Sequence, residues 1–213
     1  MVIISSIILA AGISKRFPAG KLIQKIIVDH KELSLIKYII EKFKAIDYIS
    51  EIVVVIGHDK LRIMNSINDP FIKFVLNPNY MAGMSYSVKA GVRSVIKYAD
   101  IVVIHPGDVP FIKVHTIDEL IRKAVELYRF NKEFIVIPKY GVKGGHPLII
   151  SRGLIRYVLE ISEETRGLKG FLNRFRDKIV YYPTSDLGVL YDIDRPEDLE
   201  KAQELFKIKW IRK

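Results

Sequence analysis

Apolar runs and amphipathic segments alternate along the chain, and their order predicts the class of fold. Apolar runs of strand length lie at Ile3–Leu9, Glu51–Ile56, Lys73–Leu76, Ile101–Ile104, Phe134–Ile137, Pro147–Ile150, Ile179–Tyr182 and Val189–Ile193. Segments with apolar residues at helical spacing lie at Leu35–Ile46, Asp59–Ile67, Ser85–Lys97, Thr116–Arg129, Gly153–Ile161, Leu168–Arg176 and Pro196–Phe206. Strands that alternate with helices in this way predict an α/β fold with a mostly parallel sheet.

The same pattern indicates where a ligand would bind. The chain shows no repeat and no linker-like segment, so we expect one domain over residues 1–213. Ligands of mostly parallel sheets bind beyond the carboxyl ends of the strands. Polar or glycine-containing loops follow four of the predicted strands, at Ala10–Lys21, Gly57–Asp59, Asn77–Ser87 and His105–Pro110. We therefore expect these loops to meet at one edge of the sheet and to carry the chemistry.

Charge and composition narrow the class of partner. The 213 residues have a formal net charge of +10, which favours anionic partners such as nucleotides and phosphorylated substrates. Cysteine is absent, which excludes disulfides, thiolate catalysis and cysteine-ligated zinc. Without a membrane-length apolar run or a basic leader before the first strand, we expect a cytoplasmic protein with no membrane partner. No stripe of interleaved aromatic and basic residues is present, so we expect no nucleic-acid partner.

The first loop after a predicted strand has the features of an anion-binding site. Small residues let a ligand approach the backbone closely, exposed N–H groups bind anions, and Arg16 and Lys21 add positive charge. The candidate phosphate-binding residues here are Leu9, Ala10, Ala11, Gly12, Ser14, Arg16 and Lys21. The loop has neither a Walker pattern nor a Gly-x-Gly-x-x-Gly fingerprint, so a plain strand-to-helix turn is the alternative.

The loop His105–Pro110 carries a candidate metal ligand. Asp108 follows an apolar strand and lies between two prolines, which would hold it in a rigid turn facing the first loop. Mg²⁺ prefers a few carboxylates together with substrate phosphates, and Asp108 fits that preference. The alternative is an aspartate that caps the following turn.

Polar residues also open the helix predicted after Asn77. Gly83, Ser85 and Ser87 lie at its start, where the helix N-terminus would add positive potential toward an anion. Capping of the helix by either serine explains the same residues without a ligand.

Two later segments are candidates of the same kind. Gly141–Pro147 is glycine-rich and basic, and its alternative is a surface hairpin in which His146 is simply packed. Asp192 and Asp194 alternate with Ile193 on a predicted strand and so share one face. One of these acids is a candidate second metal ligand, and capping of the last helix by Asp194 is the alternative.

Five motifs in this order resemble the MobA-like nucleotidyltransferases, and among them the molybdenum cofactor cytidylyltransferases. The matching segments are Leu-Ala-Ala-Gly-x-Ser-x-Arg-Phe with a following Lys-Leu (residues 9–17 and 21–22), Asn-Pro-x-Tyr-x-x-Gly-Met (residues 77–84, continuing to 91), Gly-Asp-x-Pro (residues 107–110), Gly-His-Pro (residues 145–147) and Asp-Ile-Asp-x-Pro-Glu-Asp-Leu (residues 192–199). Together the motifs span nearly the whole chain.

The resemblance implies a Rossmann-like, three-layer α/β/α sandwich of the nucleotide-diphospho-sugar-transferase type. It also implies transfer of a nucleoside monophosphate from an NTP to a phosphorylated acceptor, with release of pyrophosphate. Under it Lys21 and Arg16 bind the triphosphate, Asp108 binds Mg²⁺, and Asp194 is a further metal ligand. The implied nucleotide-binding set extends to Asn77, Gly83, Ser85, Ser87, Pro106, Gly107 and Asp108, and the implied acceptor-binding set is Gly145, His146 and Pro147.

The resemblance also bears on the nucleotide. Guanylyltransferase relatives have a glycine where this chain has Ala11, and Ala11 together with Gly-His-Pro resembles the CTP-using branch. The leading hypothesis is therefore Mg²⁺-dependent transfer of CMP from CTP to the molybdopterin cofactor, with Arg16, Lys21 and Asp108 as catalytic residues. The alternatives are transfer to a sugar phosphate, polyol phosphate or phospholactate-like acceptor, and a chaperone that carries a nucleotide cofactor. A molybdenum hydroxylase, into which the chaperone would carry its cofactor, is a candidate partner.

Overall fold

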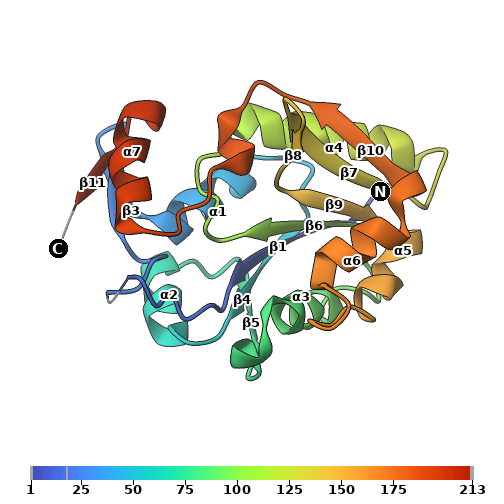
Figure 1. Ribbon diagram of the computed structural model, residues 1–213, viewed down its shortest axis with the longest axis horizontal. Helices are drawn as coiled ribbons and strands as arrows, with labels where there is room; N and C mark the ends of the chain where they lie inside the picture. The colour runs from blue at the N-terminus through green and yellow to red at the C-terminus, as the bar shows by residue number, and fades with distance from the viewer. Residues whose placement is uncertain (1, 18, 212–213) are drawn as a thin grey trace.

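A mixed, mostly parallel sheet lies between two layers of helices in the computed structural model, which describes residues 2–17 and 19–211 (Figure 1). The strands of this sheet are β1 (Ile4–Ala10), β4 (Glu51–Ile56), β5 (Ile72–Leu76), β6 (Ile101–Pro106), β7 (Ile135–Tyr140), β8 (Lys143–Gly144), β9 (Leu148–Ser151) and β10 (Ile179–Pro183). Their order is β10-β7-β9-β6-β1-β4-β5, with β8 paired to β7. The short β8 and β9 run antiparallel to their neighbours, and the other pairs are parallel. The predicted three-layer α/β fold is confirmed.

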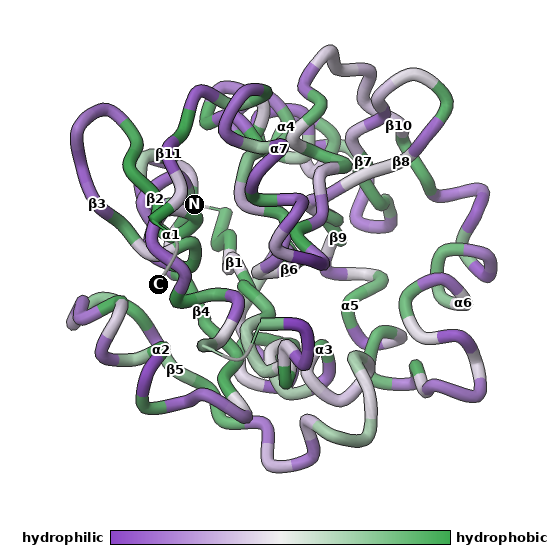
Figure 2. Tube along the Cα trace, turned by 60° about the vertical axis from the view of Figure 1, so that its left-hand side comes forward, coloured by the Kyte–Doolittle hydropathy of each residue, from purple (hydrophilic) through white to green (hydrophobic). Residues whose placement is uncertain are grey.

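The main strands are mostly apolar because helices cover both faces of the sheet (Figure 2). One face packs against α1 (Leu35–Lys44), α2 (Lys60–Ile67) and α4 (Val114–Tyr128), and the other against α3 (Met84–Arg93), α5 (Arg152–Val158) and α6 (Gly167–Arg174). Successive residues of β4 show the alternation, since Val54 packs under the first layer and Val53 and Val55 under the second. A strand buried on both faces has few polar positions, and those present, such as Ser5 and Ser6 of β1, are buried as well.

A second, smaller sheet and the last helix lie to one side of the main sheet (Figure 1). It consists of β2 (Lys25–Val28), β3 (Lys31–Ser34) and β11 (Lys209–Ile211), all antiparallel, and the helix is α7 (Pro196–Phe206). The hairpin turn between β2 and β3 is formed by Asp29 and His30, whose φ angles are 48° and 65°. Two central residues with positive φ angles form the tight turn that connects the two strands of a hairpin. The sequence-based interpretation missed this hairpin because the turn contains no glycine.

A hydrophobic cluster beside the small sheet joins segments that are distant in the sequence. Its buried members include Phe17 of the first loop, Phe111 of the loop after β6, and Ile193 just before α7. Phe17 directly follows Arg16, and Ile193 directly precedes Asp194. Phe111 lies on the same loop as Asp108. The cluster therefore holds together the three segments that carry the predicted charged site residues.

The predicted strand at Val189–Ile193 is wrong. The segment instead begins as the 3-10 helix η3 (Leu187–Leu190), because the Asp186 side chain accepts a hydrogen bond from the Gly188 N–H at 2.9 Å and closes a turn. Val189 and Ile193 are fully buried, but in different hydrophobic clusters. The apolar pattern here thus reflects burial of an irregular segment and not a strand.

The other predicted elements are present and differ in length. The helix predicted to reach Lys97 ends at Arg93, and residues 94–98 continue as turns. Two further 3-10 helices, η1 (Tyr80–Ala82) and η2 (Arg176–Lys178), precede α3 and β10. Within residues 2–17 and 19–211, no helix is long and apolar enough to cross a membrane.

Candidate functional site

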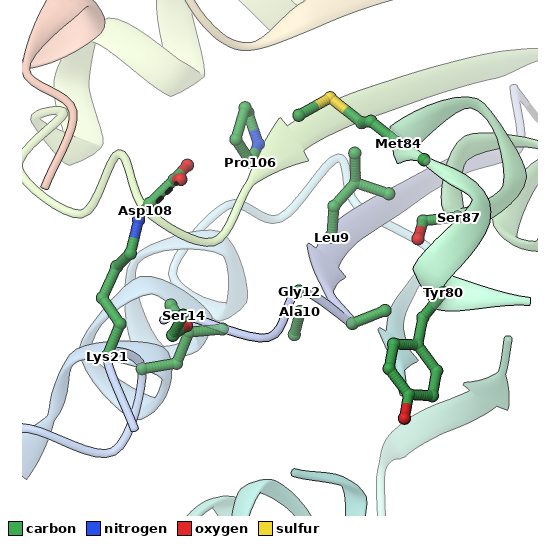
Figure 3. A pocket seen from close by; sticks show the side chains of 13 residues that line it. Leu9, Ala10, Gly12, Ser14, Lys21, Tyr80, Met84, Ser87, Pro106 and Asp108 are labelled. Carbon is green, nitrogen blue, oxygen red and sulfur yellow. Dashed lines mark hydrogen bonds and ion pairs between the residues drawn. The ribbon is translucent and has the colours of Figure 1, made fainter. Parts of the chain in front are cut away.

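A cleft of about 240 Å³ opens where β1 and β6 end and α3 begins (Figure 3). The predicted nucleotide-binding residues that line it are Leu9, Ala10, Ala11, Gly12, Ser14, Lys21, Gly83, Ser87, Pro106 and Asp108. In Figure 3, Lys21 and Asp108 lie on one side of the cleft, and Tyr80, Met84 and Ser87 on the other. The loops after β1, β5 and β6 therefore meet at one edge of the sheet, as the strand order requires.

The first loop is held in shape from behind while its inner face stays open. The Phe17 N–H donates to the Ser14 carbonyl oxygen at 2.8 Å, and the Arg62 guanidinium of α2 donates to the Ala19 carbonyl oxygen at 2.6 Å. A Cβ placed on Gly12 would have no other atom within 4 Å. The loop is therefore preformed, and the space beside Gly12 belongs to the cleft.

Lys21 is the cation at the floor of the cleft. It is 9% exposed, and its Nζ lies 3.0 Å from Asp108 Oδ2 and 3.6 Å from Asp194 Oδ1. The side chains of Asp108 and Asp194 are 34% and 59% exposed. The structure thus brings the predicted lysine and both predicted metal ligands to one place.

Arg16 lies in a hollow that adjoins the cleft rather than in the cleft itself. The hollow shares Ser14 and Lys21 with the cleft and is also lined by Asp194. The Arg16 side chain is 57% exposed, and its guanidinium contacts the Asp194 carbonyl oxygen at 3.2 Å and the Asp194 Oδ1 at 3.9 Å. Such exposed contacts are weak, so the side chain is free to turn toward an anion in the cleft.

Asp194 does not cap the last helix, so the capping alternative is wrong. The carboxylate of Asp198 instead accepts hydrogen bonds from the backbone N–H groups of both Asp194 and Arg195, each at 2.8 Å. Because Asp198 satisfies the start of α7, the Asp194 side chain is left to face Lys21. The expected shared strand face of Asp192 and Asp194 does not exist, since this segment is irregular.

Negative charge accumulates at this point despite Lys21. Burial, followed by the neighbouring carboxylates of Asp108 and Asp194, raises the pKa of Asp192 to about 6. A divalent cation would relieve this repulsion, and carboxylate oxygens are the ligands that Mg²⁺ and Mn²⁺ prefer. Among the described residues, no group of three or more histidine, cysteine, aspartate or glutamate side chains is arranged to hold a metal ion. The residues present therefore fit a cation that takes its remaining ligands from a substrate.

The start of α3 is held by side chains that do not all reach the cleft. Asn77 donates to Ser87 Oγ at 2.9 Å, and the Ser85 N–H donates to Glu163 Oε1 at 2.9 Å. Neither serine caps α3, because Gly83 occupies the N-cap position with φ 120°. Asn77 and Ser85 thus lie behind the cleft wall, where their contacts support it.

Gly107 also lies behind the cleft and brings the Asp108 loop against β1. Its N–H donates to the Leu9 carbonyl oxygen at 2.9 Å, and a Cβ at this position would lie 2.7 Å from the same oxygen. A glycine is therefore required for this close approach of two backbones. Tyr80, Met84 and Leu22, which also line the cleft, were not predicted from residue type, since aromatic and aliphatic residues carry no distinct signal.

A second cavity of about 220 Å³ adjoins the cleft and is mostly apolar. Leu9, Met84 and Pro106 line both spaces, and Leu168, Leu172 and Tyr181 close the far side of the second. Of the predicted acceptor-binding residues, Gly145 and His146 line this cavity and Pro147 does not.

His146 is one of two side chains with hydrogen-bonding groups that line this second cavity among the described residues, the other being Tyr181. Burial lowers the pKa of the His146 ring below the usual range of histidine. Its Nδ1 is buried and has no hydrogen-bond partner among the described residues. A buried ring nitrogen without a partner is uncommon in proteins, which marks His146 as a candidate hydrogen-bonding group for a ligand of this cavity.

Comparison with known protein families shows to which family this chain belongs. Residues 6–179 match the family described as the MobA-like NTP transferase domain. The chain belongs to that family. It is therefore a nucleotidyltransferase, and the resemblance that the sequence motifs indicated is confirmed.

Relatives of this family member agree in fold over nearly their whole length. The molybdenum cofactor cytidylyltransferase of Escherichia coli (strain K12) is 24% identical over 204 residues, which cover 95% of this chain and 97% of that protein. Rv0371c of Mycobacterium tuberculosis H37Rv has a TM-score of 0.79 at 17% identity, covering 95% of this chain and 98% of that one. Another structure of Rv0371c is a complex with manganese. A nucleotidyl transferase from Methanothermobacter has a TM-score of 0.79 at 19% identity, covering 96% and 98%.

The cleft and the second cavity adjoin each other and differ in character. The cleft has small residues, open backbone and the Lys21 ammonium, which suit an anionic ligand. The second cavity has mostly apolar walls and includes His146. Met84 and Pro106 line both spaces, so the two spaces meet beside the loop that begins at Gly107.

Proposed function

We propose that this nucleotidyltransferase transfers CMP from CTP to the molybdopterin cofactor in a Mg²⁺-dependent reaction and releases pyrophosphate. The observation that carries the proposal is the convergence of Lys21, Asp108 and Asp194 beside the open first loop. Transfer of a phosphoryl-type group needs little covalent help from a protein, and it depends on positioning and charge neutralisation. A buried ammonium, two carboxylates and exposed backbone supply these functions.

Ala11 supports CTP as the nucleotide. It is 2% exposed and lines the cleft, and Gly57 packs behind it so closely that a Cβ on Gly57 would lie 2.9 Å from the Ala11 methyl carbon. Guanylyltransferase relatives have a glycine at this position, so the resemblance to the CTP-using branch favours CTP. The name of the similar Escherichia coli protein, a cytidylyltransferase, agrees with this choice.

The second cavity supports an acceptor with a flat ring, whose faces can pack on apolar walls, over a sugar or polyol phosphate. Its walls are formed by Leu168, Leu172, Ile137 and other apolar groups, with His146 as a hydrogen-bonding site. The hydroxyl groups of a sugar would lose their water partners against such walls, at a cost of about 1–3 kcal/mol for each unpaired group. The pterin ring of molybdopterin would bury its faces and present nitrogen atoms to His146.

The chemistry forms one bond and breaks one. An oxygen of the acceptor phosphate attacks the α-phosphorus of CTP, and the bond from that phosphorus to the α,β-bridging oxygen breaks, so that pyrophosphate leaves with the electron pair. The acceptor phosphate needs no general base, because its second pKa is about 6 and it is largely ionised near neutral pH. Lys21 and Arg16 would hold the departing phosphates. Asp108, with Asp194, would hold Mg²⁺, which supplies neutralisation of phosphate charge when bound.

A panel assay tests the proposal. Each of the four NTPs is combined with molybdopterin and with several sugar phosphates, and pyrophosphate release is measured. We expect turnover with CTP and molybdopterin. A preference for GTP, or no turnover with molybdopterin, would overturn the assignment of the nucleotide or the acceptor. Binding of labelled CTP without pyrophosphate release would contradict the enzymatic activity and support a carrier of nucleotide cofactors.

A further inference from the structure

Lys42 of α1 is buried beneath the loop that carries Asp108. It is 8% exposed, and its Nζ donates to the carbonyl oxygens of Pro110 at 2.8 Å and Ile112 at 2.7 Å. The same Nζ lies 3.9 Å from the centre of the Tyr38 ring. Lys42 does not line the cleft, so it acts on the loop from inside the protein.

The stability of the core does not explain why a lysine occupies the buried position 42. Burial lowers the pKa of Lys42 to about 7, and the attraction of Asp186 only partly offsets that effect. The flanking positions of α1 at Ile39 and Phe43 are fully buried and apolar. An apolar side chain at position 42 would avoid the desolvation of an ammonium group. However, an apolar side chain would not donate hydrogen bonds to the two backbone carbonyl groups.

The loop needs such donors because its backbone groups lack the regular hydrogen bonds of a helix or a sheet. Residues 107–113 have neither helical nor strand conformation. His105 bonds through Nε2 to the Val109 carbonyl oxygen at 2.8 Å, and the Ile193 N–H donates to the Asp108 carbonyl oxygen at 2.8 Å. With Lys42 on Pro110 and Ile112, side chains and one distant amide bind the carbonyl oxygens of residues 108, 109, 110 and 112. Asp108 itself lines the cleft.

The far end of the loop is held by a buried group of opposite charge. The Asp186 carboxylate accepts from the Lys113 N–H at 2.8 Å and from Thr116 Oγ1 at 2.9 Å. It also closes the turn of η3, which leads toward Asp194. Lys42 and Asp186 thus fix consecutive stretches of one segment, and the segment begins at the carboxylate that faces Lys21.

We propose that Lys42 is a positioning residue that holds the Pro110 and Ile112 carbonyl groups and thereby sets where the Asp108 carboxylate stands. The inference rests on the proposed function in that it assumes Asp108 acts in nucleotidyl transfer. The loss of Lys42 would let the loop shift without removing any group that contacts the ligand. A displacement of about 1 Å in a catalytic group lowers turnover by as much as about 100-fold.

Lys42→Met is the first variant, because it keeps most of the apolar stem and removes the donors. We expect kcat to fall at least about tenfold, the half-saturating Mg²⁺ concentration to rise, and the KM for CTP to change less than about twofold. Lys37→Met, on the same helix and without a contact to the loop among those the structure shows, is the matched control and should have normal kinetics. Lys42→Gln keeps N–H donors on a shorter side chain, and it should lose less activity than Lys42→Met.

The absence of cysteine allows a chemical rescue. Lys42→Cys introduces a unique thiol, and alkylation with 2-bromoethylamine in the unfolded state, followed by refolding, restores an ammonium group at the length of lysine. We expect the alkylated protein to regain most of the lost kcat, and wild-type protein taken through the same steps to be unchanged. A loss in Lys42→Met that alkylated Lys42→Cys does not recover would overturn the proposal, as would wild-type kcat in both Lys42→Met and Lys42→Gln.

Two measurements separate this inference from the proposed function. Amide hydrogen exchange in residues 107–112 and the affinity for Mn²⁺ in the presence of CTP both report on the loop without turnover. We expect faster exchange and weaker Mn²⁺ binding in Lys42→Met than in Lys37→Met. If the wild-type protein released no pyrophosphate, the proposed function would fail while these measurements still tested Lys42. Unchanged exchange and unchanged Mn²⁺ affinity would overturn the positioning role.

Discussion

Lys21 and Asp108 lie 87 residues apart in the sequence, and their side chains meet at 3.0 Å, Nζ to Oδ2. The lysine side chain is 10% exposed and the aspartate side chain 34%, so the pair forms at the floor of the cleft with its acidic partner toward the opening. The Asp108 side of the pair is partly exposed, so screening by water limits what the pair contributes to stability. Its importance lies in placing a cation and a carboxylate where the loops after β1 and β6 meet.

Removal of either member of this pair should abolish transfer and leave the fold intact. Lys21→Met and Asp108→Asn should each lower pyrophosphate release at least about 100-fold, because each removes charge that acts on the reacting phosphates. The melting temperature should change by only a few degrees. Lys44→Met, which breaks the exposed pair with Asp69 far from the cleft, is the control and should have normal turnover. Near-normal turnover in Lys21→Met or Asp108→Asn would sink the assignment.

Arg16 should contribute to nucleotide binding through its forked guanidinium. Arg16→Ala should raise the KM for CTP about tenfold, since a hydrogen bond to a charged group contributes about 1.5–3 kcal/mol. Arg16→Lys should recover part of the loss, because a lysine supplies charge without the planar fork. Arg129→Ala, an exposed residue that follows α4, is the control. A KM for CTP in Arg16→Ala equal to that of the control would contradict the role of Arg16.

Substitution of two glycines should affect ligand binding in one case and the stability of the protein in the other. Gly12→Ala should leave the melting temperature unchanged and weaken CTP binding, because the added methyl group meets only the open space of the cleft. Gly57→Ala should destabilise the protein by about 1–3 kcal/mol, since its Cβ would lie 2.7 Å from the Ala11 carbonyl oxygen. Calorimetry and CTP titration of both variants provide the comparison. Full CTP affinity in Gly12→Ala would show that the nucleotide does not use this space.

The second cavity should control the acceptor and not the nucleotide. Leu172→Trp on α6 should fill part of the cavity and raise the KM for molybdopterin, with little change in the KM for CTP. Asn173→Trp places the same bulk at the next, exposed position and should leave both KM values unchanged. If Leu172→Trp altered the KM for CTP instead, the acceptor would have to bind elsewhere.

Lys42 should make the stability of the protein depend on pH in the alkaline range. Its pKa is about 7 in the folded state and near 10.5 in the unfolded state, so the unfolded state binds more protons between these values. The free energy of unfolding should therefore rise from about pH 7 to about pH 10.5 in the wild type. The difference between wild type and Lys42→Met, measured by urea unfolding at pH 6 and pH 9, isolates this term. A difference that did not grow in favour of the wild type at pH 9 would contradict the lowered pKa.

Most of the architecture was predictable because local patterns follow local causes. The apolar runs of β1, β4 and β6 are nearly continuous because both sheet faces are covered, and the helices have the spacing of one buried face. The strand predicted at Val189–Ile193 failed since burial alone made it apolar, and the Asp29–His30 hairpin was missed because its turn lacks glycine. Local pattern does not distinguish these cases.

The sequence by itself determined the family, the order of the layers and the loops that carry chemistry, because periodicity and short motifs depend on residues close together along the chain. The tertiary structure alone decided which side chains meet. It paired Lys21 with Asp108, gave the capping of α7 to Asp198 so that Asp194 faces the cleft, and placed Lys42 beneath the Asp108 loop. These contacts join residues from separate elements. Their geometry follows from how helices and sheet pack together, which no segment of the chain specifies alone.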